Sequence, residues 1–213
     1  MKNSKKLKVI FIIERILEMQ IKKIGFDLDG VILDNTTFKK ENYKKVYNLD
    51  FDNWQLSANI IDEFVPDREM RRKIGTLASA RNFTKLLDEN CIETLNDLNK
   101  KNYELYIVSR RGLSDNGQKA AWKSINELEL GKYFKEIIFC ENEKEKIETI
   151  INKGIDIFFD DRMGVIEGIL GKISIPVLFD SFDLVAKSII KVNDDFKVIK
   201  NFKEIGDLIK ENE

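Results

Sequence analysis

The stretch IGFDLDGVILDN, residues 24–35, decides the fold. Its apolar start is typical of a buried strand, and the strand ends in two carboxylates, Asp27 and Asp29, followed by Gly30. A strand end aims a side chain rigidly, and a carboxylate two residues further on can face the same cavity from another angle. Gly30 leaves room for a ligand beside the backbone. The stretch therefore predicts a site at the mouth of the first strand.

Apolar runs further along the chain predict the rest of the core. Strands are expected over 103–109, 137–140, 155–161 and 173–179, with helices over 118–129, 143–153 and 164–171 and a last helix in the tail. Strands that alternate with helices predict an α/β fold, in which a Rossmann-like parallel sheet has helices on both faces. Pro176 predicts that the run over 173–179 is an edge strand.

The segment over 34–80 is polar and has a helical pattern, which predicts a small helical cap inserted after the first strand. Residues 83–100 place apolar side chains at helical spacing and predict one amphipathic helix. We therefore expect a core made of 19–33 and 81–213. In the cap, only Trp54, Phe51 and Phe64 could stack on a base, and such aromatic side chains more often pack in a core.

Residues 1–18 begin with basic residues and continue into a short apolar run. That run is too short to cross a membrane, Glu14 and Arg15 interrupt it, and no small-residue cleavage site follows. We expect a disordered or loosely helical extension without a targeting role; the alternative is that Met19 is the natural start. The expected protein is cytoplasmic and does not associate with membranes.

Composition excludes several kinds of chemistry. The 213 residues include no histidine, so Ser-His-Asp triads, Cys-His pairs and His-ligated zinc are excluded. Acid–base work then falls to carboxylates or lysine, and a metal site would use oxygen ligands, which suits Mg²⁺. The 36 Lys and Arg against 37 Asp and Glu argue against a nucleic-acid partner. Cys91 and Cys140 have no paired spacing and predict buried thiols in a reducing compartment.

Three predicted strands end in residues that can carry chemistry. Asp27 and Asp29 follow the first strand, Ser109 ends the next one along the chain, and Asp160 and Asp161 end the run over 155–161. The carboxyl ends of parallel strands meet at one edge of the sheet, where ligands bind. Crowded carboxylates repel one another, and a bound Mg²⁺ relieves this and neutralises a phosphate. The sequence predicts a phosphate and magnesium site at this edge.

Two other acidic motifs do not match. A calcium loop needs Asp or Asn at its fifth position and Glu at its twelfth, where this chain has Val31 and Phe38. A phosphoacceptor receiver domain has its paired acids first and its lysine last, whereas the acid pair Asp160-Asp161 comes last here.

The segments resemble the four motifs of the haloacid-dehalogenase-like (HAD) hydrolases. FDLDGVILD (26–34) is similar to the first motif, YIVSRR (106–111) to the second, and KIETIINKGIDIFFDD (146–161) to the third and fourth together, in the order of the family. A finer resemblance, to the 5′(3′)-deoxyribonucleotidase branch, rests on the Ser-Arg of the second motif and on Trp122. The resemblance implies a HAD-like core and a Mg²⁺-dependent phosphatase.

The resemblance also implies roles for the site residues. Asp27 would be the nucleophile that forms an aspartyl-phosphate, and Asp29 would protonate the leaving alcohol and then deprotonate the attacking water. The metal would bind the Asp27 carboxylate, the Asp29 backbone carbonyl and one acid of the fourth motif. Alignment favours Asp161 as that ligand, with Asp160 behind it or sharing the ion.

A lysine, a serine and an arginine complete the expected site. Lys146 is favoured as the third-motif lysine, and Lys144 is the alternative. Taken by itself, Lys146 would usually lie on a solvated helix face. Ser109 and Arg110 are expected to bind substrate, although either Arg110 or Arg111 could instead face solvent.

The expected substrate is a nucleoside monophosphate. The alternatives are a sugar phosphate or another small phosphorylated metabolite, a phosphate at a nucleic-acid end, or a catalytically silent HAD-like binding domain. The sequence carries no signal for the oligomeric state.

Overall fold

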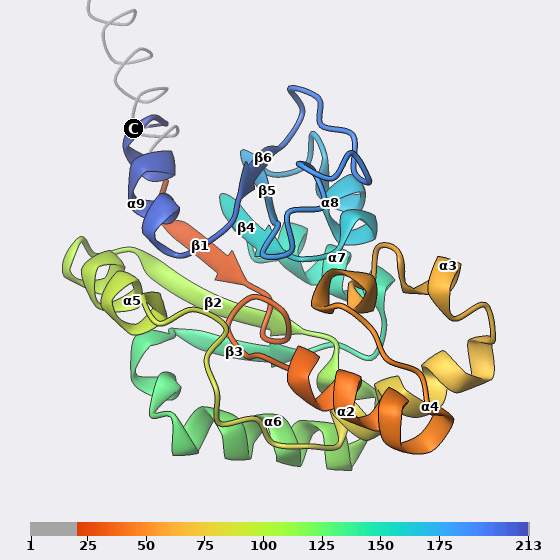
Figure 1. Ribbon diagram of the computed structural model, residues 1–213. Helices are drawn as coiled ribbons and strands as arrows, with labels where there is room; N and C mark the ends of the chain where they lie inside the picture. The colour runs from red at the N-terminus through yellow and green to blue at the C-terminus, as the bar shows by residue number, and fades with distance from the viewer. Residues whose placement is uncertain (1–20, 213) are drawn as a thin grey trace, which may run out of the picture.

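The computed structural model describes residues 21–212, so the expectation for residues 1–18 lies outside the described residues. Six parallel strands form one sheet in the order β3-β2-β1-β4-β5-β6 (Figure 1). They are β1 (Lys23–Phe26), β2 (Glu104–Ser109), β3 (Glu136–Phe139), β4 (Ile157–Asp160), β5 (Ile175–Phe179) and β6 (Lys197–Ile199). The predicted α/β fold with a Rossmann-like parallel sheet is confirmed.

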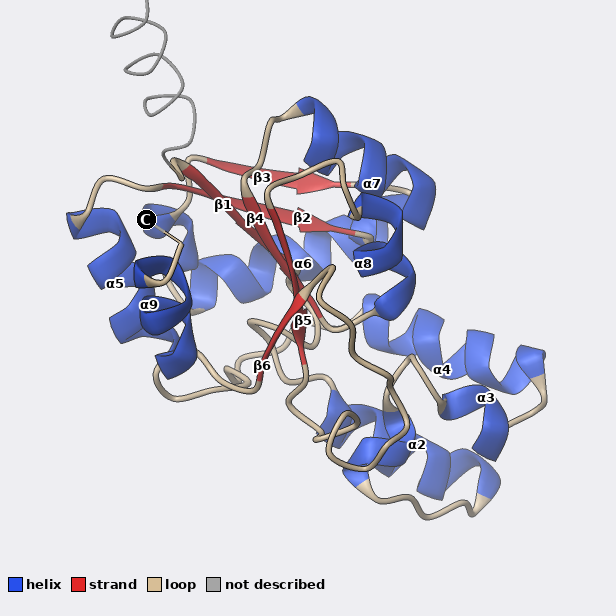
Figure 2. Ribbon diagram, turned by 90° about the horizontal axis from the view of Figure 1, so that it is seen from above, coloured by secondary structure: helices blue, strands red, loops and turns tan. Residues whose placement is uncertain are grey.

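Helices cover both faces of the sheet because successive strand residues point to opposite sides. Phe159 packs with residues of α5, α6 and α9, whereas its neighbour Phe158 packs with residues of α7 and α8. Figure 2 shows these two groups of helices on opposite sides of the sheet. These helices are α5 (Cys91–Lys100), α6 (Asp115–Glu127), α7 (Glu143–Asn152), α8 (Met163–Ile169) and α9 (Lys203–Lys210), with the 3₁₀ turns η2 (Arg111–Leu113) and η3 (Leu130–Tyr133). Cys91 and Cys140 are free and buried, as predicted.

The segment between β1 and α5 is helical and has an apolar cluster of its own. It contains α2 (Thr36–Tyr47), η1 (Asn53–Leu56), α3 (Ile61–Phe64) and α4 (Arg68–Ser79). Tyr43, Phe51, Leu56, Val65 and Ile74 form its buried cluster. Helices α2, α3 and α4 lie beyond the carboxyl end of the sheet (Figures 1 and 2). That residues 34–80 work as a separate cap stays a prediction.

The single helix predicted over 83–100 is wrong in its first half, because α5 begins only at Cys91. The preceding residues pair with the loop after β1 instead: Leu87 N–H donates to the Ile32 carbonyl, and Asp34 N–H donates to the Lys85 carbonyl. Apolar spacing alone did not reveal that the backbone of this segment is held by a loop some 50 residues away in sequence.

The edge position predicted for Pro176 is also wrong, because β5 lies between β4 and β6. The N–H of Ile175 turns toward β4 and donates to the Asp156 carbonyl. The Pro176 nitrogen therefore faces the β6 side, where the register begins only at Val177. Proline is tolerated inside this sheet because no strand partner needs its missing N–H.

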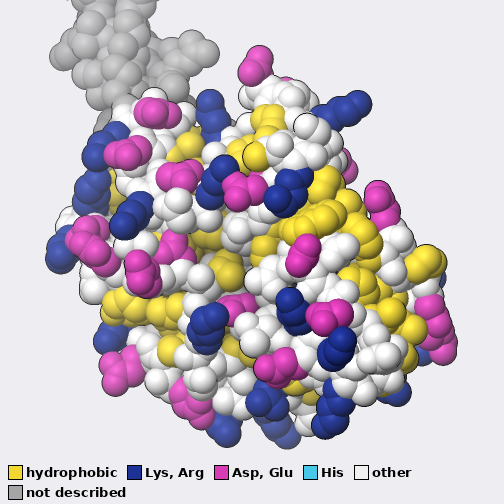
Figure 3. All heavy atoms as spheres, in the orientation of Figure 1, with side chains coloured by type: hydrophobic (Ala, Val, Ile, Leu, Met, Phe, Trp, Pro, Cys, Tyr) yellow, Lys and Arg dark blue, Asp and Glu magenta, His cyan; other side chains and the backbone are white. Residues whose placement is uncertain are grey.

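Two general properties concern the charges on the surface and the length of the helices. On the face shown in Figure 3, acidic and basic side chains are interspersed, in keeping with the formal net charge of -1. Within residues 21–212, no helix has the length and apolar character needed to span a membrane.

Candidate active site

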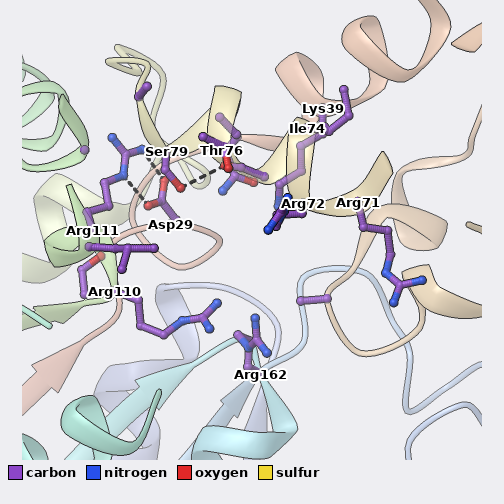
Figure 4. A pocket seen from close by; sticks show the side chains of 18 of the residues that line it. Asp29, Lys39, Arg71, Arg72, Ile74, Thr76, Ser79, Arg110, Arg111 and Arg162 are labelled. Carbon is purple, nitrogen blue, oxygen red and sulfur yellow. Dashed lines mark hydrogen bonds and ion pairs between the residues drawn. The ribbon is translucent and has the colours of Figure 1, made fainter. Parts of the chain in front are cut away.

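A cavity of about 710 Å³ opens at the carboxyl edge of the sheet. Residues of the loops after β1, β2 and β4 line one side of it, and residues of α2 and α4 line the other. Figure 4 shows several of the charged side chains that line this space. In open parallel sheets this edge is the usual place for a ligand.

A buried lysine lies between two carboxylates at the floor of the site. Lys146 Nζ lies 2.7 Å from Asp27 Oδ1 and 2.7 Å from Asp160 Oδ2. Asp27 directly follows β1, and its N–H donates to the Phe159 carbonyl of β4 at 2.9 Å, which fixes its position. The sheet and α7 therefore bring together residues that are 119 and 133 positions apart.

The structure places Lys146 in this cluster and leaves Lys144 outside. The Lys144 side chain is 85% exposed and its nearest acid is Glu148, at 3.8 Å. The difference comes from the register of α7, which the Asn142 side chain caps by accepting the Glu145 N–H. Lys146 then falls on the buried side of the helix.

Burial and crowding shift the pKa values of these groups. Burial raises the pKa of Asp27 to about 6; the charge of Lys146 lowers it, and that of Asp160 raises it. Burial also raises the pKa of Asp161 to about 7, with a further rise from the charge of Asp160. Burial works to lower the pKa of Lys146, but Asp160 and Asp27 outweigh it and that pKa is raised. A charged lysine therefore lies beside Asp27, a carboxyl group that resists ionisation.

Three carboxylates offer a site for a metal ion. Oxygen atoms of Asp27, Asp160 and Asp161 lie within 4.8 Å of one another. Asp160 uses both of its oxygens, one on Lys146 and one on the Arg162 N–H. Asp161 forms no ion pair among residues 21–212. An all-oxygen set of crowded acids fits Mg²⁺, because the ion would offset their mutual repulsion.

Gly30 makes room for this group of acids. Its φ of 87° lies in the region that favours glycine. A Cβ atom at this position would lie 2.4 Å from Asp161 Oδ2, closer than a side chain can approach. The turn after β1 and the Asp161 carboxylate can therefore occupy neighbouring positions only because residue 30 has no side chain.

Asp29 is held by Arg111, a partner that the sequence did not single out. The Arg111 Nε and Nη2 atoms donate to the two Asp29 oxygens at 2.6 Å each. The Arg111 Nη1 atom donates to the Arg81 carbonyl at 2.9 Å, so the buried guanidinium is fixed on three sides. Which of the two arginines after Ser109 turns inward depends on η2, where Gly112 N–H donates to the Cys140 carbonyl. Local sequence does not reveal that choice.

Ser109 and Arg110 both line the cavity, but in different settings. Ser109 ends β2 and is buried. The Arg110 side chain is 37% exposed, and its Nη1 lies 3.9 Å from Glu143 Oε2. Arg162, which follows the acid pair, contacts the same oxygen at 3.1 Å. No motif in the local sequence marks Arg162.

Two residues of the segment between β1 and α5 also reach the site without a sequence signal. The Asn59 amide donates to the Asp161 carbonyl at 2.7 Å and accepts the Met163 N–H at 2.9 Å. Lys39 of α2 lines the cavity; burial lowers its pKa, while the charges of Asp161 and Asp29 raise it. Sequence patterns do not report contacts over 100 residues long, such as those of Asn59.

The aromatic side chains considered for base stacking do not line the cavity. Phe51 is buried in the apolar cluster of the helical segment. Trp54 packs edge-to-face on Phe64, with ring centroids 5.3 Å apart. Trp122 lies on α6 against Phe139 and is 43% exposed.

Comparisons with known proteins support the fold. No protein-family model matches the chain. A Bacillus cereus (strain ATCC 14579) protein named "Putative nucleotidase" is 25% identical over 202 residues, which cover 88% of this chain and 98% of that protein. A β-phosphoglucomutase from Clostridium difficile superposes with a TM-score of 0.58 at 17% identity, over 91% of this chain and 97% of that one. A HAD-superfamily hydrolase from Ehrlichia chaffeensis gives 0.56 at 16% identity, over 91% and 99%. The predicted HAD-like fold is confirmed.

Proposed function

We propose that this chain, which has the HAD-like fold, is a Mg²⁺-dependent phosphomonoester hydrolase that works through an aspartyl-phosphate. The observation that carries the proposal is the buried Lys146 between Asp27 and Asp160, of which Asp27 lines a cavity together with other charged side chains. Such a cluster holds a carboxylate nucleophile next to fixed positive charge, as attack on an anionic phosphate requires.

In the proposed reaction an Asp27 oxygen attacks phosphorus, and the bond from phosphorus to the alcohol oxygen breaks. Asp29 gives its proton to that oxygen, and then takes a proton from the water that attacks the aspartyl-phosphate. Inorganic phosphate leaves and the Asp27 carboxylate is restored. Ser109 and the backbone N–H groups after β2 would hold the phosphoryl oxygens. Because Arg111 contacts both Asp29 oxygens, one of these contacts must open when Asp29 carries the proton.

The residues present fit Mg²⁺. The Asp27 carboxylate, the Asp29 backbone carbonyl and the Asp161 carboxylate would hold the ion. We favour Asp161 over Asp160 because Asp160 Oδ1 accepts the Arg162 N–H and its Oδ2 lies 2.7 Å from the Lys146 ammonium, whereas Asp161 forms no ion pair among residues 21–212. A divalent ion bound there supplies positive charge that neutralises the phosphate and the carboxylates.

The first test is turnover of p-nitrophenyl phosphate by the purified protein. We expect hydrolysis with Mg²⁺, loss of activity in excess EDTA, and recovery when Mg²⁺ is restored in excess over the chelator, because the crowded acids need the divalent charge. Activity that persists in EDTA would contradict the metal-dependent mechanism. No turnover of any phosphomonoester with Mg²⁺ would favour a silent binding domain.

The second test is the pH dependence of metal binding, read from thermal unfolding without substrate. The pKa of Asp27 rises from 3.8 unfolded to about 6 folded, and that of Asp161 rises from 3.8 to about 7. The folded state therefore binds these protons more tightly, and the stability that these acids contribute falls as pH rises from about 4 to 7.

Mg²⁺ needs the deprotonated carboxylates. We expect saturating Mg²⁺ to raise Tm by about 5–10 °C near pH 8 and far less near pH 5. The Asp161→Asn variant should lose most of the gain at the higher pH. An equal gain at both pH values, or one that Asp161→Asn retains, would remove these acids from the metal site.

We consider two classes of substrate for the proposed phosphatase. The name of the Bacillus cereus relative supports a nucleoside monophosphate. A smaller ester without a base is the second candidate, because the cavity lining includes several cations and none of the aromatic side chains Trp54, Phe51 and Phe64. The ratio of kcat/KM for a nucleoside 5′-monophosphate to that for a pentose 5-phosphate separates them. In either case we propose that residues 34–80 act as the cap that encloses the ester.

A further inference from the structure

We propose that the leaving group of the substrate carries a second anionic group, a carboxylate or a phosphate, which Arg110 and Arg162 bind. The inference rests on the phosphomonoesterase function proposed above and narrows the class of ester. It follows from the position of the two arginines, from the single acid they share, and from the charge of the cavity lining.

The two arginines flank the nucleophile. Arg110 directly follows β2, and Arg162 lies two residues after β4. Strand β1 lies between β2 and β4 in the sheet, so Asp27 sits between the two loops. In Figure 4 the guanidinium groups of Arg110 and Arg162 lie side by side and face the cavity, opposite Arg72 of α4. When the phosphate of a substrate lies against Asp27, the leaving group attached to that phosphate would pass within reach of the two arginines.

One carboxylate oxygen lies within ion-pair distance of both guanidinium groups but forms no hydrogen bond with either. Glu143 Oε2 lies 3.1 Å from Arg162 Nη2 and 3.9 Å from Arg110 Nη1. Two positive charges against one negative charge leave this trio with a net charge of +1. The buried Nε of Arg162 also has no hydrogen-bond partner among residues 21–212. Like charges placed side by side and half-buried are costly unless an anion offsets them.

The Glu143 carboxylate lies against the backbone of α8. A Cβ atom on Gly164, at the start of α8, would lie 2.7 Å from Glu143 Oε1, so a side chain at position 164 would displace this carboxylate. Glu143 is a positioning residue in this proposal, because it acts on the ligand only through Arg110 and Arg162.

The cavity as a whole has more positive than negative side chains. Among residues 21–212, six cationic residues line it, Lys39, Arg71, Arg72, Arg110, Arg111 and Arg162, against four acids, Asp27, Asp29, Glu141 and Asp161. Arg111 is already paired with Asp29, and Arg71 donates to the Val65 and Pro66 carbonyls and not to an acid. The acids belong mainly to the group that would hold the metal. The lining alone therefore has two positive charges in excess, and a divalent ion on the acids would raise this excess above the two negative charges of one phosphate group.

The test uses pairs of esters that differ only in the second anion. Phosphoglycolate is compared with ethyl phosphate, and butane-1,4-diyl bisphosphate with butyl phosphate, which separates a carboxylate from a phosphate. We expect kcat/KM to favour one anionic member by about tenfold or more, the size of a charge-assisted contact. In Arg162→Gln this preference should fall by about tenfold, mainly through KM, and Arg162→Lys should restore part of it. Arg68→Gln, an exposed arginine of α4 outside the cavity, should keep the full preference.

Binding to the full-length Asp27→Asn protein separates this inference from the proposed function. Calorimetry with the same ester pairs and Mg²⁺ measures affinity without turnover. If the wild-type protein hydrolyses both members equally well, the second-anion site is refuted and the phosphatase stands. If nothing is hydrolysed but the anionic member binds more tightly and loses this advantage in Arg162→Gln, the phosphatase falls and the anion site stands. If there is neither turnover nor a binding preference, both are overturned.

Discussion

Replacing Asp27 with asparagine should lower kcat for p-nitrophenyl phosphate by about 10⁴-fold or more, because an amide cannot form the acyl-phosphate. The fold should survive, because asparagine has nearly the same shape and the backbone N–H of residue 27 still donates to the Phe159 carbonyl. Burial already raises the pKa of Asp27 to about 6, so loss of its charge removes a group that resists ionisation. We expect Tm to fall by only a few degrees while turnover disappears, because Lys146 keeps its ion pair with Asp160.

The matched control is Asp180→Asn. Asp180 is also buried at the end of a strand, but it accepts the Leu184 and Val185 N–H groups and does not line the cavity. This variant should keep wild-type turnover, even if its stability falls. Measured kcat above a hundredth of wild type in Asp27→Asn would show that Asp27 is not the nucleophile.

Much of the core was predictable from local sequence. Each strand that carries a site residue is a short apolar run, and parallel strands deliver their ends to one edge, so the positions of Asp27, Ser109 and Asp160 follow from the topology. The lysine of the third motif could be narrowed to Lys144 and Lys146, because these are the two lysines of α7, the helix that precedes β4. The choice of Lys146 over Lys144 needed the register of α7, which the Asn142 cap fixes.

The parts that sequence did not predict depend on distant contacts. Arg111 and not Arg110 holds Asp29 because η2 turns it inward against the Arg81 carbonyl. Asn59 joins the Asp161 loop across 102 residues. Residues 83–90 do not continue the helix, because backbone groups of this segment form hydrogen bonds with the loop after β1 instead. In each case tertiary hydrogen bonds override a local preference that was ambiguous or wrong.

Replacing Lys146 with methionine should damage both stability and turnover. The ammonium lies 2.7 Å from two buried carboxylates, and its side chain is 1% exposed. Without it these acids lose their only buried cationic neighbour within ion-pair distance among residues 21–212. Removing one partner from a buried ion pair costs about 3–5 kcal/mol. The pKa of Asp27, which Lys146 lowers, should then rise above about 6, leaving less ionised nucleophile at neutral pH. We expect kcat to fall by about 10²-fold or more, the cost of one lost charge contact in a closed site.

Lys144→Met is the matched control, because it makes the same change two residues earlier on the same helix. Lys144 is 85% exposed and 3.8 Å from Glu148, so its loss should leave Tm and kcat near wild type. Chemical denaturation gives the difference in the free energy of unfolding between the two variants, and initial rates give the difference in kcat. Mg²⁺ should recover part of the stability of Lys146→Met, since a divalent ion supplies positive charge to the same acids, but not its turnover, because the fixed charge beside Asp27 is still missing. If Lys146→Met is as stable and as active as Lys144→Met, the buried lysine neither holds the acids together nor serves the reaction.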